Sequence, residues 1–527
     1  MFDILRKIKA PVLPFIEASK LRRKKFFARN PPRFNLVLAV DSYKSGHAFA
    51  YPKFVCGMAS YIEARTKGID IMIPFGRQAM LQKLLKTPIN QADIDQAADF
   101  AAARNEPFNR SVWEHILDKY NGFMPLYIRG VPEGTPVASG NAITTIMCTD
   151  EFVAENIFWL CSYFETALLR GEWYPTTIAT NDYGLIKEMK QFYVGTGADM
   201  SMLAFAFHDF GARGVTCHEQ AEIGGAAHLV NFMGSDTIEG VLYANYWYHE
   251  AMSAYSVPAT EHSVQCSFQV KVEGIPDGNG KITPFASVRV GEKEIAEGDL
   301  SYLKNTITSL GKMGGIVSIV IDGYDCIRAA KFLCNELKVT IIASGCKVVF
   351  RPDSGDMMEI LPQLIELQAE AFGTTLTSKG YKQINYVGII QGDGVDRAAV
   401  IRVLTMVKAM GYAAHTVIFG SGGALLQKVN RDTYKFAQKA SAVLVRLNDE
   451  GDTQWVGIAK DPITDPGKKS KEGVLTLARS RITGEVKTIR IDVEVGEEWE
   501  DMMVDIYDHG EFFNETTLKE VRERCAV

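Results

Sequence analysis

Short apolar runs rich in β-branched residues recur between residues 315 and 430, and each is followed by a polar, glycine-bearing loop and then by a helical stretch. This alternation predicts βα units with parallel strands. The expected strands cover residues 316–321, 347–350, 386–390 and 416–419. The expected helices cover residues 325–337, 357–372, 396–410 and 424–430. Four such units predict a barrel or an open α/β sheet that binds ligands at the carboxyl ends of its strands.

The two ends of the chain follow a different pattern. A helical stretch at 90–104, a strand-like segment at 126–140 and an amphipathic helix at 156–172 come first, and strand-like runs return after residue 441. We therefore expect a second domain built from both chain ends. The assigned parts are a basic arm at 1–33, an α+β domain at 34–175 with 440–527, and an α/β domain at 176–439 that carries the ligand site.

Composition excludes several classes of protein. A chain of 527 residues is too long for one simple core, and its 47% hydrophobic and 23% charged residues are typical of an ordinary globular protein. The net charge of -6 gives no general attraction to nucleic acid. The nine cysteines lack zinc or disulfide spacing, so a reducing cytoplasm is the expected location. No apolar run reaches the roughly 20 residues that cross a bilayer, so we expect no membrane span.

Residues 1–33 are rich in lysine and arginine and contain only two acidic residues, Asp3 and Glu17. An organelle-targeting segment or a membrane-surface helix is one interpretation of such an arm. Four prolines interrupt any helix, however, and there is neither an apolar core segment nor a small-residue cleavage site. A solvated, flexible tail is therefore the expectation.

Glycine- and aspartate-rich loops carry the candidate chemistry. They are HDFGARG from His208, GSDT from Gly234, IDGYD from Ile321, RPDSGD from Arg351, QGDGVD from Gln391 and FGSGGALLQK from Phe419, with the pair Glu261-His262 inside AYSVPATEHS. Together they supply backbone donors for phosphate, carboxylates for ribose hydroxyls or a cation, and a histidine that could carry phosphate. Neither nucleotide-binding fingerprint GxxxxGK[ST] nor GxGxxG is present, and one glycine cluster alone is usually a tight turn. The set as a whole predicts a phosphoribosyl-transfer site.

The order of these motifs, with DSYKSGH from Asp41, WYPTTIAT from Trp173, AHLVNFMGSDT from Ala227 and KDPITDP from Lys460, resembles the nicotinamide phosphoribosyltransferase family. The resemblance runs from about Phe34 to the C-terminal region. It implies a type II phosphoribosyltransferase fold, an irregular incomplete α/β barrel plus a mostly antiparallel α+β domain, in a homodimer that shares its active sites. It also implies a reaction of NAD salvage, in which nicotinamide and phosphoribosyl pyrophosphate are converted into nicotinamide mononucleotide and pyrophosphate. The cofactors implied are Mg²⁺ and ATP, whose hydrolysis proceeds through a phosphohistidine.

The resemblance also implies roles for single residues. His262 would accept the γ-phosphate of ATP, with Glu261 orienting its imidazole. Phe210 would stack on the pyridine ring, Arg213 would bind the carboxamide oxygen, and Tyr43 and Asp41 would approach the ring from the partner subunit. Asp236 would accept from the amide of nicotinamide and repel the carboxylate of nicotinic acid.

A third group would hold phosphate, ribose and magnesium. The phosphoribosyl and phosphate ligands implied are Arg351, Asp353, Gly392, Asp393, Gly422, Gly423, Arg431, Arg65, Lys439, Lys460 and Lys468. Asp322 and Asp353 would hold magnesium through water. The plain alternatives are turn and helix-cap roles for the aspartates and solvated charge for the basic residues.

Two departures from the family pattern affect fine contacts. Ala212 stands beside the motif arginine where a tyrosine is expected, and Ala437 stands where a serine is expected near the phosphates. Two other functions remain open. Nicotinate phosphoribosyltransferase activity would share the mechanism, and Asp236 argues against it. A non-catalytic nucleotide-binding or signalling protein of the same fold is opposed by the intact set of candidate residues.

Overall fold

The computed structural model describes residues 34–66, 71–148, 157–464, 469–492 and 496–526. The basic arm at 1–33 and Lys468 lie outside these ranges. The chain forms two compact units: one contains the described residues up to Trp173 together with Arg431–Thr516, and the other contains Tyr174–Asn430 and the residues from Thr517 onward. The fold is mixed α/β, with one parallel sheet and several antiparallel sheets.

The first unit is built around a seven-stranded antiparallel sheet in the order β17-β16-β1-β5-β3-β21-β22. The strands are β1 Val55–Glu63, β3 Tyr127–Gly130, β5 Ala142–Cys148, β16 Ala437–Arg446, β17 Thr453–Gly457, β21 Val504–Asp508 and β22 Glu511–Phe512. A three-stranded sheet joins β19 Val486–Arg490, β18 Leu475–Ser480 and β20 Trp499–Asp501, and β2 Ile71–Met72 pairs with β4 Val137–Ala138. All nine residues of β1 are buried, as expected of a central strand.

Helices complete this unit. They are α2 Arg77–Leu85, α3 Gln91–Arg104, α4 Arg110–Tyr120 and α5 Leu160–Tyr163, with short 3-10 turns η1 Leu36–Leu38 and η2 Ser42–Phe49. The ring of Trp113 from α4 meets Trp159, Tyr163 and Phe164 edge-on in the core. Helix α3 begins with a capping box between Asn90 and Asp93, which explains why its start could be predicted from the sequence.

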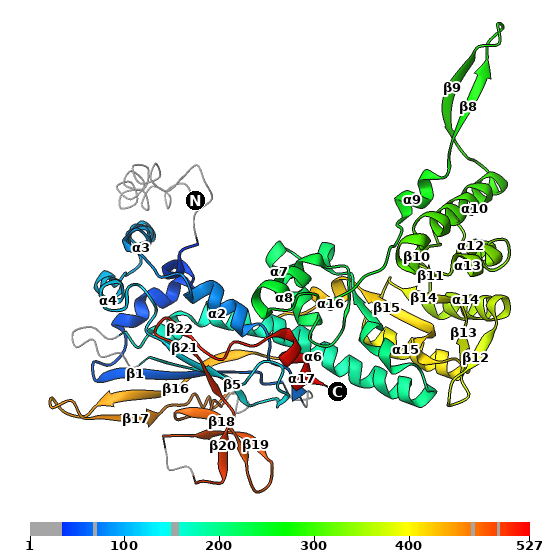
Figure 1. Ribbon diagram of the computed structural model, residues 1–527. Helices are drawn as coiled ribbons and strands as arrows, with labels where there is room; N and C mark the ends of the chain where they lie inside the picture. Colours follow the sequence, from blue (N-terminus) through cyan, green and yellow to red (C-terminus); the bar gives the residue numbers. More distant parts are fainter. Residues whose placement is uncertain (1–33, 67–70, 149–156, 465–468, 493–495, 527) are drawn as a thin grey trace. The chain divides into compact units, whose positions relative to one another are not determined.

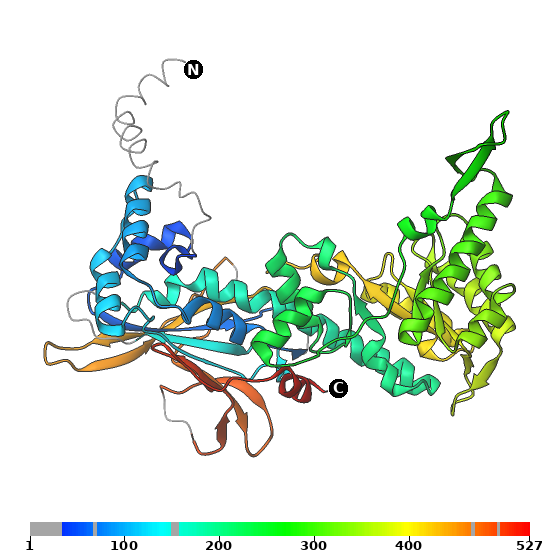
Figure 2. The same cartoon turned by 45° about the horizontal axis from the view of Figure 1, so that its top comes forward.

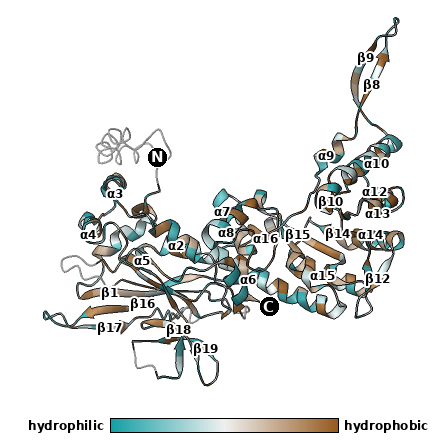
Figure 3. Cartoon of the chain, in the orientation of Figure 1, coloured by the Kyte–Doolittle hydropathy of each residue, from teal (hydrophilic) through white to brown (hydrophobic). Residues whose placement is uncertain are grey.

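The second unit contains the predicted parallel sheet, which has six strands in the order β10-β11-β14-β15-β6-β7 (Figure 1). They are β10 Ile316–Val320, β11 Lys347–Arg351, β14 Val387–Gln391, β15 Val417–Ser421, β6 Phe207–Asp209 and β7 Gly234–Ser235. Every pairing is parallel, and the sheet is curled like half a barrel. Most of its residues are buried and apolar, and β15 stands out in brown in Figure 3.

Helices flank this sheet and connect its strands. They are α6 Glu165–Thr196, α7 His218–His228, α8 Ile238–Tyr248, α9 His262–Ser267, α10 Glu292–Ser309, α11 Gly311–Gly314, α12 Cys326–Cys334, α13 Lys338–Ser344, α14 Met357–Phe372, α15 Arg397–Ala409, α16 Gly423–Leu426 and α17 Leu518–Cys525. The smaller elements are η3 Met200–Phe205, η4 Ala212–Gly214, η5 Ala414–Thr416 and the pair β12 Thr374–Leu376 and β13 Lys382–Ile384.

The four predicted strands are confirmed to within two residues at each end. Three helix predictions are wrong in length. The helix expected at 325–337 ends at Cys334. The helix expected at 424–430 ends at Leu426, because the side chains of Tyr174 and Gln220 bind the Leu426 carbonyl and stop the turn. The helix expected to end at residue 172 instead continues through Pro175 as α6, since a proline removes only one N–H donor from a long packed helix.

Three boundaries differ from those assigned on the sequence. The first division falls at 173/174, inside α6, and the next at 430/431. The last residues, 517–526, group with the second unit and not with the α+β region. The reason is that Arg522 of α17 donates to the carbonyls of Leu229 and Ser253, both at 2.7 Å.

A β-hairpin formed by β8 Val270–Pro276 and β9 Ile282–Val288 extends from the second unit between α9 and α10, as Figures 1 and 2 both show. The sequence analysis does not predict it. One face of the hairpin is entirely apolar or glycine: it carries Val270, Val272, Gly274, Pro276, Ile282, Pro284, Ala286 and Val288. Among the helices that the structure describes, none has the length and apolar character needed to cross a membrane.

Candidate active site

A cavity of about 850 Å³ lies in the second unit, among the loops that follow the parallel strands. Its walls come from the loops after β6, β7, β11, β14 and β15 and from residues 259–261. Ten residues predicted for the site line it: Phe210, Arg213, Asp236, Glu261, Arg351, Asp353, Gly392, Asp393, Gly422 and Gly423. The structure therefore brings together candidates from six motifs that are separate in the sequence.

The ring of Phe210 lies against a strand that has no side chain at this point. A Cβ on Gly420 of β15 would be 1.9 Å from the Phe210 ring, and one on Gly392 would be 3.4 Å away. The Phe210 amide donates to the Ser421 carbonyl at 2.9 Å, which fixes the backbone. Glycine is therefore required at 420 for the ring to occupy this place, where it offers a flat apolar surface to a ligand.

The Asp236 carboxylate is exposed in the cavity, and the residue is held by one backbone contact and one side-chain contact. Its amide donates to the Asp209 carbonyl at 2.9 Å, and its side chain accepts from the Ser256 hydroxyl. Behind it, burial raises the pKa of Asp209 and lowers the pKa of His208 to about 4. The His208 imidazole is therefore neutral at physiological pH.

Arg351 connects the cavity to the segment that carries the motif histidine. Its Nη2 donates to the Thr260 carbonyl at 2.7 Å. The Thr260 amide donates to Ser318 of β10 at 3.0 Å, and its hydroxyl contacts the Tyr302 hydroxyl at 2.6 Å. Residues 258–260 thus run beside β10 as an added extended segment, which places Glu261 and His262 at the end of the sheet.

His262 begins helix α9, and its Nε2 lies 3.0 Å from Oδ1 of Asp322. Glu261 instead accepts a hydrogen bond from the Ser263 hydroxyl. In this structure the hydrogen-bond partner of the imidazole is Asp322, because the loop after β10 brings that carboxylate to Nε2. The expected orienting role of Glu261 stays a prediction. The side chain of His262 is 45% exposed, whereas that of Asp322 is 3% exposed, so the histidine can meet a ligand from solvent.

The start of α9 is held by a buried polar network. Gln265 accepts from the Gly323 amide at 3.0 Å and donates to Asp299 at 3.2 Å. Asp299, which is fully buried, also pairs with Arg328 at 3.0 Å. This network joins α9, α10, α12 and the loop of Asp322, so the orientation of His262 relative to Asp322 is set by several elements.

The two predicted magnesium residues follow neighbouring parallel strands, β10 and β11. Oδ2 of Asp322 is buried and has no hydrogen-bond partner among the described residues, and Asp353 lines the cavity. An unpaired carboxylate oxygen after one strand, with a second carboxylate after the neighbouring strand, suits a hard cation that keeps part of its water shell. Within the described residues no three His, Cys, Asp or Glu side chains gather as a closed metal site, so these carboxylates fit a cation held partly by water or ligand.

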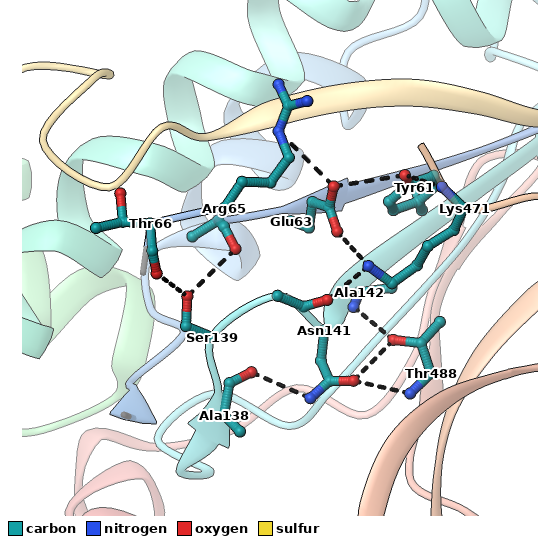
Figure 4. A network of polar contacts seen from close by, with 12 residues as sticks. Tyr61, Glu63, Arg65, Thr66, Ala138, Ser139, Asn141, Ala142, Lys471 and Thr488 are labelled. Atoms are coloured by element: carbon teal, nitrogen blue, oxygen red, sulfur yellow. Dashed lines mark hydrogen bonds and ion pairs between the residues drawn. The ribbon is translucent and has the colours of Figure 1, made fainter. Parts of the chain in front are cut away.

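The remaining phosphate candidates belong to the first unit. Burial lowers the pKa of Lys439. The nearby Glu165 carboxylate raises this pKa, whereas the positive charges of Arg65, Lys44 and Lys460 lower it further. These four cations therefore form one cluster. Figure 4 shows the terminal nitrogens of Arg65 directed away from the network of Glu63, Tyr61 and Lys471. Such a cluster can bind a polyanion.

Three further candidates in the first unit do not line the cavity. Tyr43 on η2 is 66% exposed, and the Asp41 carboxylate accepts from Thr166 at 2.7 Å. Arg431 pairs with Asp432 at 2.7 Å. Of the two departures, Ala212 lines the cavity, and Ala437 begins β16 opposite Glu63.

Several residues of the site were not predicted from the sequence. Thr260, Gln427 and Lys428 line the cavity, and Ser256 binds Asp236. All four lie within or beside motifs that the sequence analysis singled out, so position in a motif was the available signal. Lys428 adds a cation at the end of the loop that carries Gly422 and Gly423.

Comparison with known proteins gives matches along nearly the whole chain. Residues 205–491 match the profile of the Nicotinate phosphoribosyltransferase (NAPRTase) family, and residues 35–128 match that of the Nicotinamide phosphoribosyltransferase, N-terminal domain. A nicotinamide phosphoribosyltransferase of Xanthomonas campestris pv. campestris (strain 8004) is 41% identical over 93% of this chain and 97% of the relative. One of Acinetobacter baylyi (strain ATCC 33305 / BD413 / ADP1) is 29% identical over 94% of this chain and 97% of the relative.

Solved structures share the fold at low sequence identity. Nicotinate-nucleotide pyrophosphorylase from Pyrococcus furiosus superposes with a TM-score of 0.57 at 14% identity, covering 95% of this chain and 97% of the other. Human nicotinic acid phosphoribosyltransferase superposes with a TM-score of 0.52 at 14% identity, covering 93% of both chains.

Proposed function

Because the chain belongs to the nicotinate phosphoribosyltransferase family, we propose that it transfers the phosphoribosyl group of phosphoribosyl pyrophosphate to nicotinamide, forming nicotinamide mononucleotide in NAD salvage. The similarity to nicotinamide phosphoribosyltransferases over 93% of the chain supports the choice of nicotinamide. The observation that carries the proposal is the cavity itself, in which Asp236, Arg213 and Phe210 lie with Arg351, Asp353 and Asp393.

The first three residues suit a pyridine carboxamide. Phe210 provides the flat surface for the ring, Arg213 donates to the carboxamide oxygen, and Asp236 accepts from the amide nitrogen. The carboxylate of nicotinic acid, in the place of this amide, would be repelled by the Asp236 carboxylate. The site should therefore prefer nicotinamide to nicotinic acid, although the name of the family refers to nicotinate.

The second three residues suit the phosphoribosyl donor. In the reaction, the bond from C1 of ribose to the pyrophosphate oxygen breaks, and the leaving oxygen takes both electrons. The lone pair of the pyridine nitrogen forms the new bond to C1, and no proton needs to move. Arg351 binds phosphate, and Asp353 and Asp393 hold ribose hydroxyls, while the amides of Gly422 and Gly423 meet the 5'-phosphate.

Four carboxylates but only three cationic side chains line the cavity: Asp236, Glu261, Asp353 and Asp393 against Arg213, Arg351 and Lys428. A donor with several phosphate charges needs more positive charge than these supply. When bound, magnesium neutralises charge on the pyrophosphate, and Asp322 and Asp353 are the residues that would hold it, through water.

His262 is the proposed acceptor of the γ-phosphate of ATP. Its Nε2 donates to the Asp322 carboxylate, which leaves the lone pair of the neutral imidazole on Nδ1. Nδ1 forms the bond to phosphorus as the bond to ADP breaks. Asp322 stabilises the positive charge that develops on the ring, as a carboxylate does for a catalytic histidine.

The finer architecture follows the same family. We assign the second unit as an irregular incomplete α/β barrel domain and the first as a mostly antiparallel α+β domain. The protein acts as a homodimer in which Tyr43, Asp41 and the cation cluster of one subunit serve the cavity of the other. We propose a cytoplasmic location, because the nine cysteines lack the spacing of a disulfide framework.

Two experiments test this function. In the first, pyrophosphate release is measured with phosphoribosyl pyrophosphate, magnesium and nicotinamide, and it should require all three. Release should be lost in Asp353→Asn and kept in Asp449→Asn, a control at an exposed position. No nicotinamide-dependent release by the wild type would contradict the proposal. Intact mass after incubation with Mg-ATP should show one added phosphate that is absent in His262→Ala. An unmodified wild type would remove the phosphohistidine step alone.

A further inference from the structure

His228 and Asp182 form a buried pair behind the base-binding loop that the mechanism above does not use. We propose that His228, oriented by Asp182, is a positioning residue that holds the carbonyl of Gly234 and thereby places Asp236 for recognition of the base. This inference rests on the proposed function, because it assigns Asp236 to the substrate amide.

The contacts connect the pair directly to the loop. Nδ1 of His228 lies 2.7 Å from Oδ2 of Asp182, and Nε2 lies 3.1 Å from the Gly234 carbonyl oxygen. The side chains of His228 and Asp182 are 0% and 2% exposed. Gly234 comes two residues before Asp236, so the imidazole bridges helix α6 to the strand that carries the selecting carboxylate.

The proton arrangement follows from the partners. A carbonyl oxygen only accepts, so Nε2 of His228 must carry a proton and donate to Gly234. Burial disfavours the imidazolium, but the carboxylates of Asp182 and Asp209 outweigh this and raise the pKa of His228. A carboxylate at Nδ1 therefore favours the imidazolium, in which Nδ1 donates to Asp182 and Nε2 donates to Gly234. Without it, the neutral ring could hold its proton on Nδ1 and turn a lone pair toward the carbonyl.

The loop needs such an anchor because β7 is the edge strand and has only two residues. A Cβ on Gly234 would be 2.6 Å from the His208 ring, so the strand passes directly over that side chain. The position of His228 is itself well defined. Its ring stacks on Phe232 with centroids 5.4 Å apart, and α7 packs on α8 where a Cβ on Gly240 would lie 2.6 Å from Gly225.

Paired substitutions separate positioning from mere packing. His228→Leu fills the space but cannot donate to Gly234, whereas His228→Gln keeps an N–H donor near the place of Nε2. Asp182→Leu removes the carboxylate that favours the imidazolium, whereas Asp182→Asn can donate to Nδ1 of the neutral ring and so keep the proton on Nε2. Leu229→Ala, at a fully buried neighbour, is the control for general destabilisation.

The expected result is a roughly tenfold rise in KM for nicotinamide in both leucine variants, with kcat and the KM for phosphoribosyl pyrophosphate little changed. The Gln and Asn variants should recover most of the loss, and Leu229→Ala should leave the KM for nicotinamide unchanged. Equal changes in every kinetic constant, or the same KM rise in Leu229→Ala, would overturn the inference.

Hydrogen exchange gives a readout that does not require activity. The amides of Ser235 and Asp236, which donate to Tyr255 and Asp209, should exchange faster in the leucine variants than in the Gln and Asn variants. Equal protection in all four would overturn the positioning role. Failure of the proposed function would appear separately, as absence of nicotinamide mononucleotide with the wild-type protein.

Discussion

Asp209 and Asp236 stand at the same edge of the parallel sheet but in opposite surroundings. Asp209 is fully buried, and burial raises its pKa, whereas the Asp236 side chain is exposed in the cavity. The first is suited to holding the backbone, and the second is free to meet a ligand. The sequence indicates both as acidic positions, but only the structure separates their surroundings.

Substitution of the exposed member tests base selection. Asp236→Asn removes the charge that repels nicotinic acid and keeps the shape of the side chain. We expect the ratio of kcat/KM for nicotinamide to that for nicotinic acid to fall by roughly a hundredfold. The measurement is initial rate on each base separately, with Asp396→Asn as a control at a helix cap outside the cavity. An unchanged ratio would exclude Asp236 as the selecting residue.

His208 gives a prediction for pH. Its pKa is about 4 in the folded protein and about 6.5 when unfolded, so the unfolded chain binds more protons between these values. The contribution to the free energy of unfolding is present above pH 6.5 and is lost as pH falls toward 4, by up to about 3 kcal/mol. Urea unfolding at pH 7.5 and 5 should show a smaller loss in His208→Gln than in the wild type. Identical losses of unfolding free energy in the two proteins would contradict this prediction.

At the level of elements, the parallel strands were predictable because each is a short apolar run ending in a polar loop. β10, β11, β14 and β15 follow this rule. β7 could not be found in this way, since two residues carry no pattern. The end of α16 depends on Tyr174 and Gln220, which are far away in the sequence. The Asp322–His262 contact likewise depends on how two loops meet, so the sequence led to Glu261 as the partner instead.

The fit between β15 and the Phe210 ring can be tested by one methyl group. Gly420→Ala would place a Cβ 1.9 Å from the ring, which must move. Overpacking of this kind costs about 1–3 kcal/mol, so we expect kcat/KM for nicotinamide to fall by roughly tenfold or more. Gly388→Ala on β14 is the matched control, because its Cβ would meet only the end of the Lys347 side chain at 3.3 Å. Wild-type kinetics in Gly420→Ala would contradict the role of Phe210 as the stacking surface.

At the level of the whole molecule, the candidate residues divide between the two compact units. The cavity belongs to one unit, while Tyr43 and the cluster of Lys44, Arg65, Lys439 and Lys460 belong to the other. The motif order in the sequence identified both groups. The assigned boundaries placed Arg431 and Lys439 in the α/β domain, whereas both lie in the unit that contains Arg431–Thr516.

Subunit mixing tests whether Tyr43 and the cation cluster of one subunit complete the cavity of the partner subunit. Tyr43→Ala and Asp353→Asn should each be nearly inactive alone, since each removes one half of the shared site. After mixing and exchange, hybrid dimers would contain one intact site, and activity should recover to about a quarter of the wild-type value. Recovery no greater than the sum of the two variants would show that Tyr43 does not act from the partner subunit.

The central claim is that the cavity transfers phosphoribose to nicotinamide in preference to nicotinic acid. The most direct measurement is a competition in which the purified protein receives both bases in equal amounts with phosphoribosyl pyrophosphate and Mg-ATP, and the two mononucleotides are separated by mass. The account predicts nicotinamide mononucleotide as the dominant product. Nicotinic acid mononucleotide in excess, or neither product, would contradict it.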